Sequence, residues 1–149
     1  MTAEVIESLG KIGAAIAVSF AAAGSALGTG AAGMSAVGAW KKCYAQSKAA
    51  PFLLVAFVGA PITQTFYGLI VMMTLNGKAA EGAAYPGLIG WGVFAGLAMG
   101  MSAWMQGKTG AAASDALAET GQGFVNYLMA LGVIESVALF VMIFALIGA

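Results

Sequence analysis

The chain has 149 residues, of which 61% are hydrophobic and only 8% are charged, and its formal net charge is zero. About 25% of the residues in an ordinary soluble domain are charged, so this composition cannot cover a water-facing surface of normal polarity. It indicates an integral membrane protein, and the balanced charge gives no sign of nucleic-acid binding. The single cysteine and the lack of histidine exclude an intrachain disulfide and a Cys/His metal cluster.

The N-terminal segment differs from a cleaved signal peptide. Glu4 and Glu7 precede Lys11, which reverses the expected charge order, and the apolar run that follows is longer than a signal peptide needs. We expect this run to be the first transmembrane helix. The cysteine, Cys43, is expected in a loop beside lysines.

Four apolar segments are each long enough to span a membrane, which takes about 20 residues. They cover about residues 9–39, 51–75, 87–113 and 123–147. The first and third are rich in glycine and alanine, which lets helix backbones approach one another closely in lipid. The second begins at Pro51, which suits a first helical turn, and a polar link over 78–86 follows it. These features predict an all-α membrane protein with four transmembrane helices.

An internal repeat divides the chain into two similar halves. The segment 25–30 aligns with 102–107, and Gly33 aligns with Gly110 at the same offset. The second and fourth segments align at a slightly different offset, which places Gln64 opposite Glu135. We therefore expect two tandem helical hairpins, residues 1–80 and 81–149.

The charges predict how the hairpins are oriented. Four spans place both termini on one side of the membrane. The loop 40–50 holds three of the six lysines, so the positive-inside rule predicts that it is cytoplasmic. The loop 108–122 should lie on the same side and both termini outside. The lack of a recognisable targeting peptide favours the cell (plasma) membrane.

Glu135 stands near the middle of the last and most apolar segment. A charged residue at the centre of a membrane helix costs about 2.5–3.5 kcal/mol on insertion scales, so a carboxylate there is an ion or proton site by default.

Further oxygen donors occur in the second and third segments. Thr63, Gln64 and Tyr67 share one face of the second helix. Pro61 has no backbone N–H to donate, so a carbonyl near it is available as a ligand. Gln106 contributes a second amide from the third segment. Such hard oxygen donors suit an alkali or alkaline-earth cation and disfavour zinc or copper.

The single charge of Glu135 favours a monovalent ion, because Ca²⁺ would leave the site positive in lipid. A bare proton needs fewer ligands, so the extra oxygens favour Na⁺ over H⁺. Structural alternatives stay open for the other residues: Thr63 could bond only to its own helix, Gln64 could join helices, Tyr67 could serve packing, and Gln106 could be solvated.

The chain resembles the duplicated proteolipid subunit of V-type and archaeal-type rotary ATPases. The resemblance extends over essentially the whole chain. It rests on the two-hairpin length, the glycine-rich first and third helices, the segment 61–68 (PITQTFYG), Gln106-Gly107, and Ile134-Glu135-Ser136. It implies a homo-oligomeric rotor ring with the first and third helices inside and the second and fourth outside.

The resemblance also implies roles for individual residues. Glu135 would carry the ion, and Tyr67 would hold the carboxylate in its closed form. In sodium-transporting members the matching ligands complete the site: Thr63, Gln64, Gln106 and the backbone carbonyl of Ala60. The residue before the proline is often larger than alanine in that family, a departure that concerns local packing more than the carbonyl.

Such a subunit has partners but is not an enzyme on its own. Without its ion, Glu135 would meet an arginine on a separate stator subunit, since this chain contains no arginine. Central-stalk subunits would contact the cytoplasmic side, lipid would surround the ring, and nucleotide would bind to other subunits because the chain has no P-loop. Three alternatives remain: the same ring carrying H⁺, a self-contained small ion channel or transporter, and a structural membrane scaffold.

Overall fold

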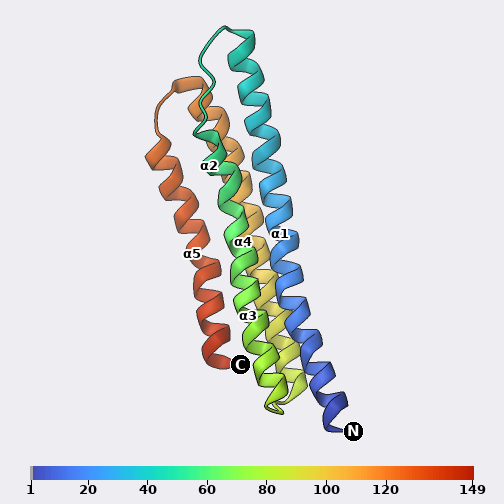
Figure 1. Cartoon of the computed structure of the whole chain (residues 1–149). Helices are drawn as coiled ribbons and strands as arrows, with labels where there is room; N and C mark the ends of the chain where they lie inside the picture. Colours follow the sequence, from blue (N-terminus) through green and yellow to red (C-terminus); the bar gives the residue numbers. More distant parts are fainter. Residues whose placement is uncertain (1) are drawn as a thin grey trace.

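The computed structural model describes residues 2–149 and is entirely helical between its turns (Figure 1). Its elements are α1 (Ala3–Ala45), α2 (Leu54–Gly59), the 3₁₀ turn η1 (Ala60–Ile62), α3 (Thr63–Ala80), α4 (Tyr85–Thr120) and α5 (Phe124–Gly148). Because α2, η1 and α3 follow one another without a break, the described residues form four helical rods that are long and apolar enough to cross a membrane. The predicted all-α, multi-pass membrane architecture is confirmed.

The rods run alternately up and down (Figure 1). The two termini lie at the end of the bundle where the turn at residues 81–84 joins α3 to α4. The connections at 46–53 and 121–123 lie at the opposite end. The bundle therefore has the predicted relation between termini and loops, while the side of the membrane on which each end lies stays a prediction.

Most of the predicted helix boundaries were too narrow, although one was too wide. Most of the predicted loop 108–122 is helical, because α4 continues to Thr120 and ends where Gly121 adopts a left-handed conformation, φ 69°. The second segment also extends further than predicted, since α3 runs on to Ala80 in the expected polar link, and it starts at Leu54 rather than Pro51. At about 1.5 Å per residue, the 43-residue α1 is roughly twice as long as the hydrocarbon core is thick. Helices of this length continue past the apolar segments from which the spans were predicted.

The loop end of the bundle is built from these helical extensions. Cys43 lies in the last turns of α1 and is buried, so its expected placement in a loop was wrong. Its Sγ lies 3.9 Å from the carbonyl oxygen of Ala118 in α4. Lys42 forms an exposed ion pair with Glu119 at 3.6 Å. The two helices thus stay in contact beyond their apolar segments.

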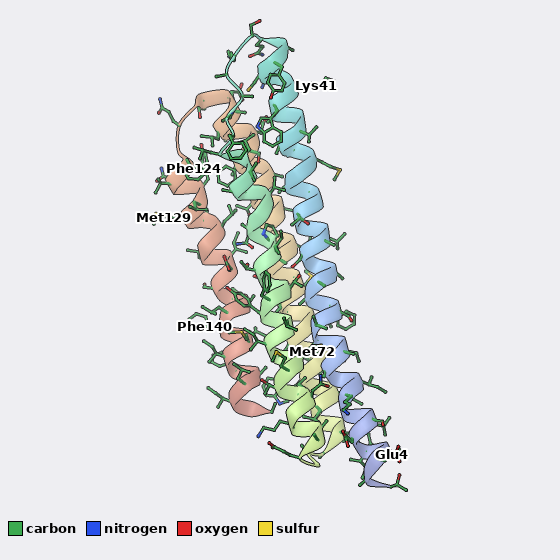
Figure 2. All side chains as sticks on the ribbon, viewed as in Figure 1. Glu4, Lys41, Met72, Phe124, Met129 and Phe140 are labelled. Atoms are coloured by element: carbon green, nitrogen blue, oxygen red, sulfur yellow. The ribbon has the colours of Figure 1, made fainter. Side chains whose placement is uncertain are left out.

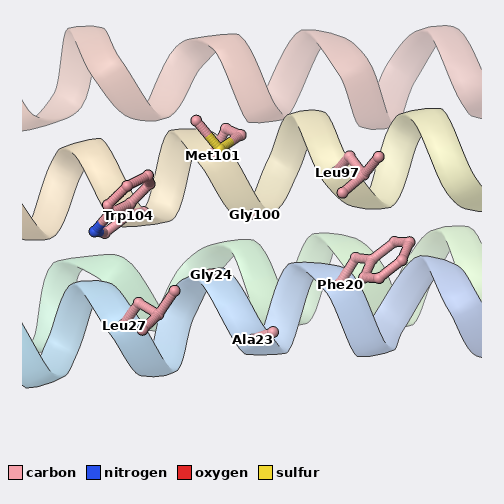
Figure 3. Close-up of a pocket in the computed structure, with 8 residues that line it drawn as sticks. All are labelled: Phe20, Ala23, Gly24, Leu27, Leu97, Gly100, Met101 and Trp104. Carbon is pink, nitrogen blue, oxygen red and sulfur yellow. The ribbon is translucent and has the colours of Figure 1, made fainter.

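Glycines bring α1 and α4 together along their lengths. A Cβ atom at Gly24 would overlap the backbone of Gly100, and one at Gly107 would overlap the backbone of Gly28. Figure 3 shows Gly24 and Gly100 facing each other at the floor of a shallow groove walled by long apolar side chains. The close helix packing expected from the glycines is present, and it joins the two glycine-rich helices to each other.

In contrast, α5 has few fully buried residues. Only Leu131, Ala138 and Ala145 of its 25 residues are buried. Large apolar side chains such as Met129 and Phe140 point away from the bundle (Figure 2). Half-buried residues such as Val141 and Tyr127 add apolar contacts, and polar contacts join α5 to α3 and α4.

Candidate ion-binding site

Pro61 shapes the entry to α3. Because its nitrogen carries no hydrogen, it cannot donate to the carbonyl one turn earlier, and the chain tightens into the 3₁₀ turn η1 at this point. The α-helix then restarts at Thr63, with Tyr67 one turn further on. This arrangement presents the polar residues of α3 to α4 and α5 near the middle of the bundle.

Both oxygens of the Glu135 carboxylate receive hydrogen bonds. The phenol of Tyr67 donates to Oε1 at 2.7 Å, and Nε2 of Gln106 donates to Oε2 at 3.2 Å. Glu135 is half-buried, and no lysine in the part of the chain that the structure describes forms an ion pair with it. The carboxylate of α5 is therefore held from α3 and α4 by neutral donors.

Two buried amides connect the helices behind the carboxylate. Nε2 of Gln64 donates to Oε1 of Gln106 at 2.8 Å, and both side chains are 0% exposed. Nε2 of Gln106 also donates to the carbonyl of Leu131 in α5 at 3.1 Å. A buried amide is costly unless its donors and acceptors are paired. These pairings orient Gln64 so that its own oxygen points toward Thr63.

The hydroxyl oxygen of Thr63 lies close to two other oxygens. Its Oγ1 lies 3.0 Å from the carbonyl oxygen of Ala60 and 3.2 Å from Oε1 of Gln64. A hydroxyl has one hydrogen and can make only one of these bonds well at a time. The Ala60 carbonyl, which also accepts the backbone N–H of Thr63, is therefore partnered from its own helix rather than free. The cluster has more lone pairs than hydrogens, which is the electrostatic character of a cation ligand set.

The structure brings the six predicted residues into one connected group. Hydrogen bonds link Tyr67 and Gln106 to Glu135, Gln64 to Gln106, and Thr63 to Gln64 and Ala60. The ion that the group would carry stays a prediction. Between residues 2 and 149 no group of three His, Cys, Asp or Glu side chains is arranged to hold a metal.

One polar contact beside the site was not expected from the sequence. Oγ of Ser102 in α4 donates to the carbonyl of Ile134, the residue before Glu135, at 2.8 Å. The available signal was its spacing, because Ser102 precedes Gln106 by four residues and so shares its helix face.

Comparison with known proteins gave one family match, which lies in the second hairpin. Residues 89–148 match the family model that describes the C subunit of ATP synthase. The matched range holds most of α4 and all of α5, including Glu135. The second hairpin is therefore similar to that ATP synthase family. A search among curated proteins gave no match.

Proposed function

We propose that this chain is the duplicated proteolipid subunit of a V-type or archaeal-type rotary ATPase and that it carries Na⁺ on Glu135 as a homo-oligomeric ring turns. The observation that carries this proposal is the oxygen cluster of Thr63, Gln64 and Ala60, in which one hydroxyl hydrogen serves two short oxygen–oxygen contacts. The similarity of the second hairpin to the C subunit of ATP synthase supports the rotor-ring part of it.

Charge balance favours a monovalent ion. Glu135 supplies one negative charge, and Thr63, Gln64, Gln106 and the Ala60 carbonyl supply neutral oxygens. Na⁺ would leave the loaded site neutral, whereas a divalent ion would leave it positive next to lipid. A neutral site can pass through the hydrocarbon region as the ring turns.

The hydrogen bonds around Glu135 favour Na⁺ over the alternative, H⁺. Tyr67 and Gln106 each aim a donor hydrogen at one carboxylate oxygen. A protonated carboxyl group would donate its hydrogen to the Tyr67 oxygen and reverse that bond, whereas the Gln106 amide can only donate through its nitrogen. Two donors directed at one carboxylate support an ionised Glu135 whose charge a metal cation balances. The extra oxygens of Thr63, Gln64 and Ala60 have no role in binding a bare proton.

The emptied site needs a positive partner from another protein. The chain contains no arginine, so a stator subunit would supply one to meet the ionised Glu135 between two half-channels. Moving one charge across the membrane is worth about 2.3 kcal/mol per 100 mV. Other subunits would bind the nucleotide and form the central stalk. The ring would lie in the plasma membrane, and the stalk would contact its cytoplasmic side, at the end of the bundle that holds residues 40–50 and 108–122.

Carbodiimide labelling of Glu135 in the purified ring tests the proposal. The reagent attacks a protonated carboxyl group in an apolar site, so bound Na⁺ should block it. With pH and ionic strength fixed, we expect protection by Na⁺ and none by K⁺. Strong labelling that Na⁺ does not change would instead establish a proton ring.

Two rivals of another class give different results. A self-contained channel or small transporter would migrate as a small unit, whereas a rotor ring stays large in detergent. A purely structural scaffold would tolerate Glu135→Gln in transport assays. The rotor proposal expects that this variant assembles normally and loses coupled ion transport.

A further inference from the structure

Two side chains of α4 donate hydrogen bonds to backbone carbonyls of α5 next to the Glu135 carboxylate. Ser102 donates to the Ile134 carbonyl at 2.8 Å, and Gln106 donates to the Leu131 carbonyl at 3.1 Å. The first carbonyl belongs to the residue just before Glu135 and the second to the residue one turn earlier. Both donors are well shielded, with Ser102 6% and Gln106 0% exposed. These two hydrogen bonds therefore join α4 to the backbone of α5 directly beside Glu135.

Apolar packing alone gives α5 little rotational restraint. Its three buried residues are one leucine and two alanines, and hydrophobic burial does not drive helices together in lipid. A side-chain tip lies about 5–6 Å from the helix axis, so a rotation of about 20° displaces it by about 2 Å. Such a displacement would break the 2.7 Å contact between Tyr67 and Glu135.

We propose that Ser102 is a positioning residue, whose hydrogen bond to Ile134 holds α5 in the rotation that brings Glu135 to Tyr67 and Gln106. The inference rests on the proposed function, because it assigns Ser102 a part in ion binding at that same site. On this basis α4 and α5 stay joined when the ion leaves, and the Glu135 side chain moves rather than the helix.

The first hairpin provides an internal comparison. Ser25 occupies the position equivalent to Ser102 in the repeat and is equally buried, at 5% exposed. Its Oγ has no hydrogen-bond partner among residues 2–149 and is the one such buried side-chain atom there. This hairpin carries Gln64 where the other carries Glu135. The buried serine thus forms an interhelical hydrogen bond in the hairpin that holds the carboxylate, and its equivalent in the other hairpin forms none.

The test compares Ser102→Ala with Ser25→Ala in the full ring. Both remove one hydroxyl from a buried site of a glycine-rich helix, but only the first removes a hydrogen bond to α5. We expect Ser102→Ala to raise the Na⁺ concentration that half-protects Glu135 from carbodiimide by about 3- to 10-fold, the equivalent of one interhelical hydrogen bond. Ser25→Ala should stay within about twofold of the unaltered chain, and Ser102→Thr, which keeps the hydroxyl, should restore protection.

The outcomes separate this inference from the proposed function. If Na⁺ protects the unaltered ring and Ser102→Ala behaves like Ser25→Ala, the positioning role is wrong. A loss of ring stability without a shift in Na⁺ protection also overturns it. If Na⁺ does not protect the unaltered ring, the sodium proposal fails, and the pH profile of labelling becomes the readout. The positioning role then predicts that the pH at which labelling is half-maximal differs between Ser102→Ala and Ser25→Ala. If the two variants have the same pH profile, the positioning role is refuted.

Discussion

Replacing Tyr67 by phenylalanine should weaken Na⁺ binding about tenfold. The change removes the O–H that donates to Oε1 of Glu135 at 2.7 Å and keeps the ring that packs against the apolar core. A hydrogen bond to a charged group contributes about 1.5–3 kcal/mol. Because Gln106 still donates to the other carboxylate oxygen, the lower value of about 1.5 kcal/mol applies, which is about tenfold in affinity.

The assay is the Na⁺ concentration that half-protects Glu135 from carbodiimide at fixed pH. Tyr127→Phe is the matched control, since it removes the same group from a tyrosine whose ring packs edge-on against Phe57, with centroids 6.3 Å apart. The control should leave protection unchanged. A Tyr67→Phe ring within twofold of the unaltered one would refute the reasoning, as would an equal shift in both variants.

Three further outcomes follow from the packing and polar contacts. Gly24→Ala should lower the thermal stability of the ring because its Cβ overlaps the backbone of α4, whereas Gly30→Ala meets open space and should keep or raise stability by about 0.5–1 kcal/mol. Gln106→Leu should abolish Na⁺ protection and destabilise the bundle, because it leaves a buried amide unpaired at a cost of about 1–3 kcal/mol. Lys42→Ala should change the melting temperature little, because its 3.6 Å contact with Glu119 is an exposed ion pair worth about 0–1 kcal/mol.

The sequence predicted those parts of the molecule that depend on composition and local pattern. The number of membrane helices follows from runs of apolar residues, and the close contact of α1 with α4 follows from glycines such as Gly24 and Gly100. Glu135 was identifiable because a carboxylate in the most apolar segment is costly. Helix ends were less predictable, because residues such as Cys43 remain helical and buried once the neighbouring helix extends equally far.

The partners of each polar side chain could not be read from the sequence, because they depend on how three helices pack. Nothing local to Gln64 and Gln106 indicates that their amides bond to each other across 42 positions of the chain. Ser25 and Ser102 are equivalent in the repeat, yet only the second reaches α5. Such differences arise from helix placement, which the spacing of residues alone does not determine.

The most direct test of the central claim is equilibrium binding of radioactive sodium to the purified, full-length protein, with Glu135→Gln as the comparison. We expect one Na⁺ to be bound per chain, binding that weakens as protons compete at lower pH, and no binding to the variant. Saturable sodium binding that survives in Glu135→Gln, or no sodium binding by the unaltered protein at any pH, would contradict the assignment of Glu135 as a sodium carrier.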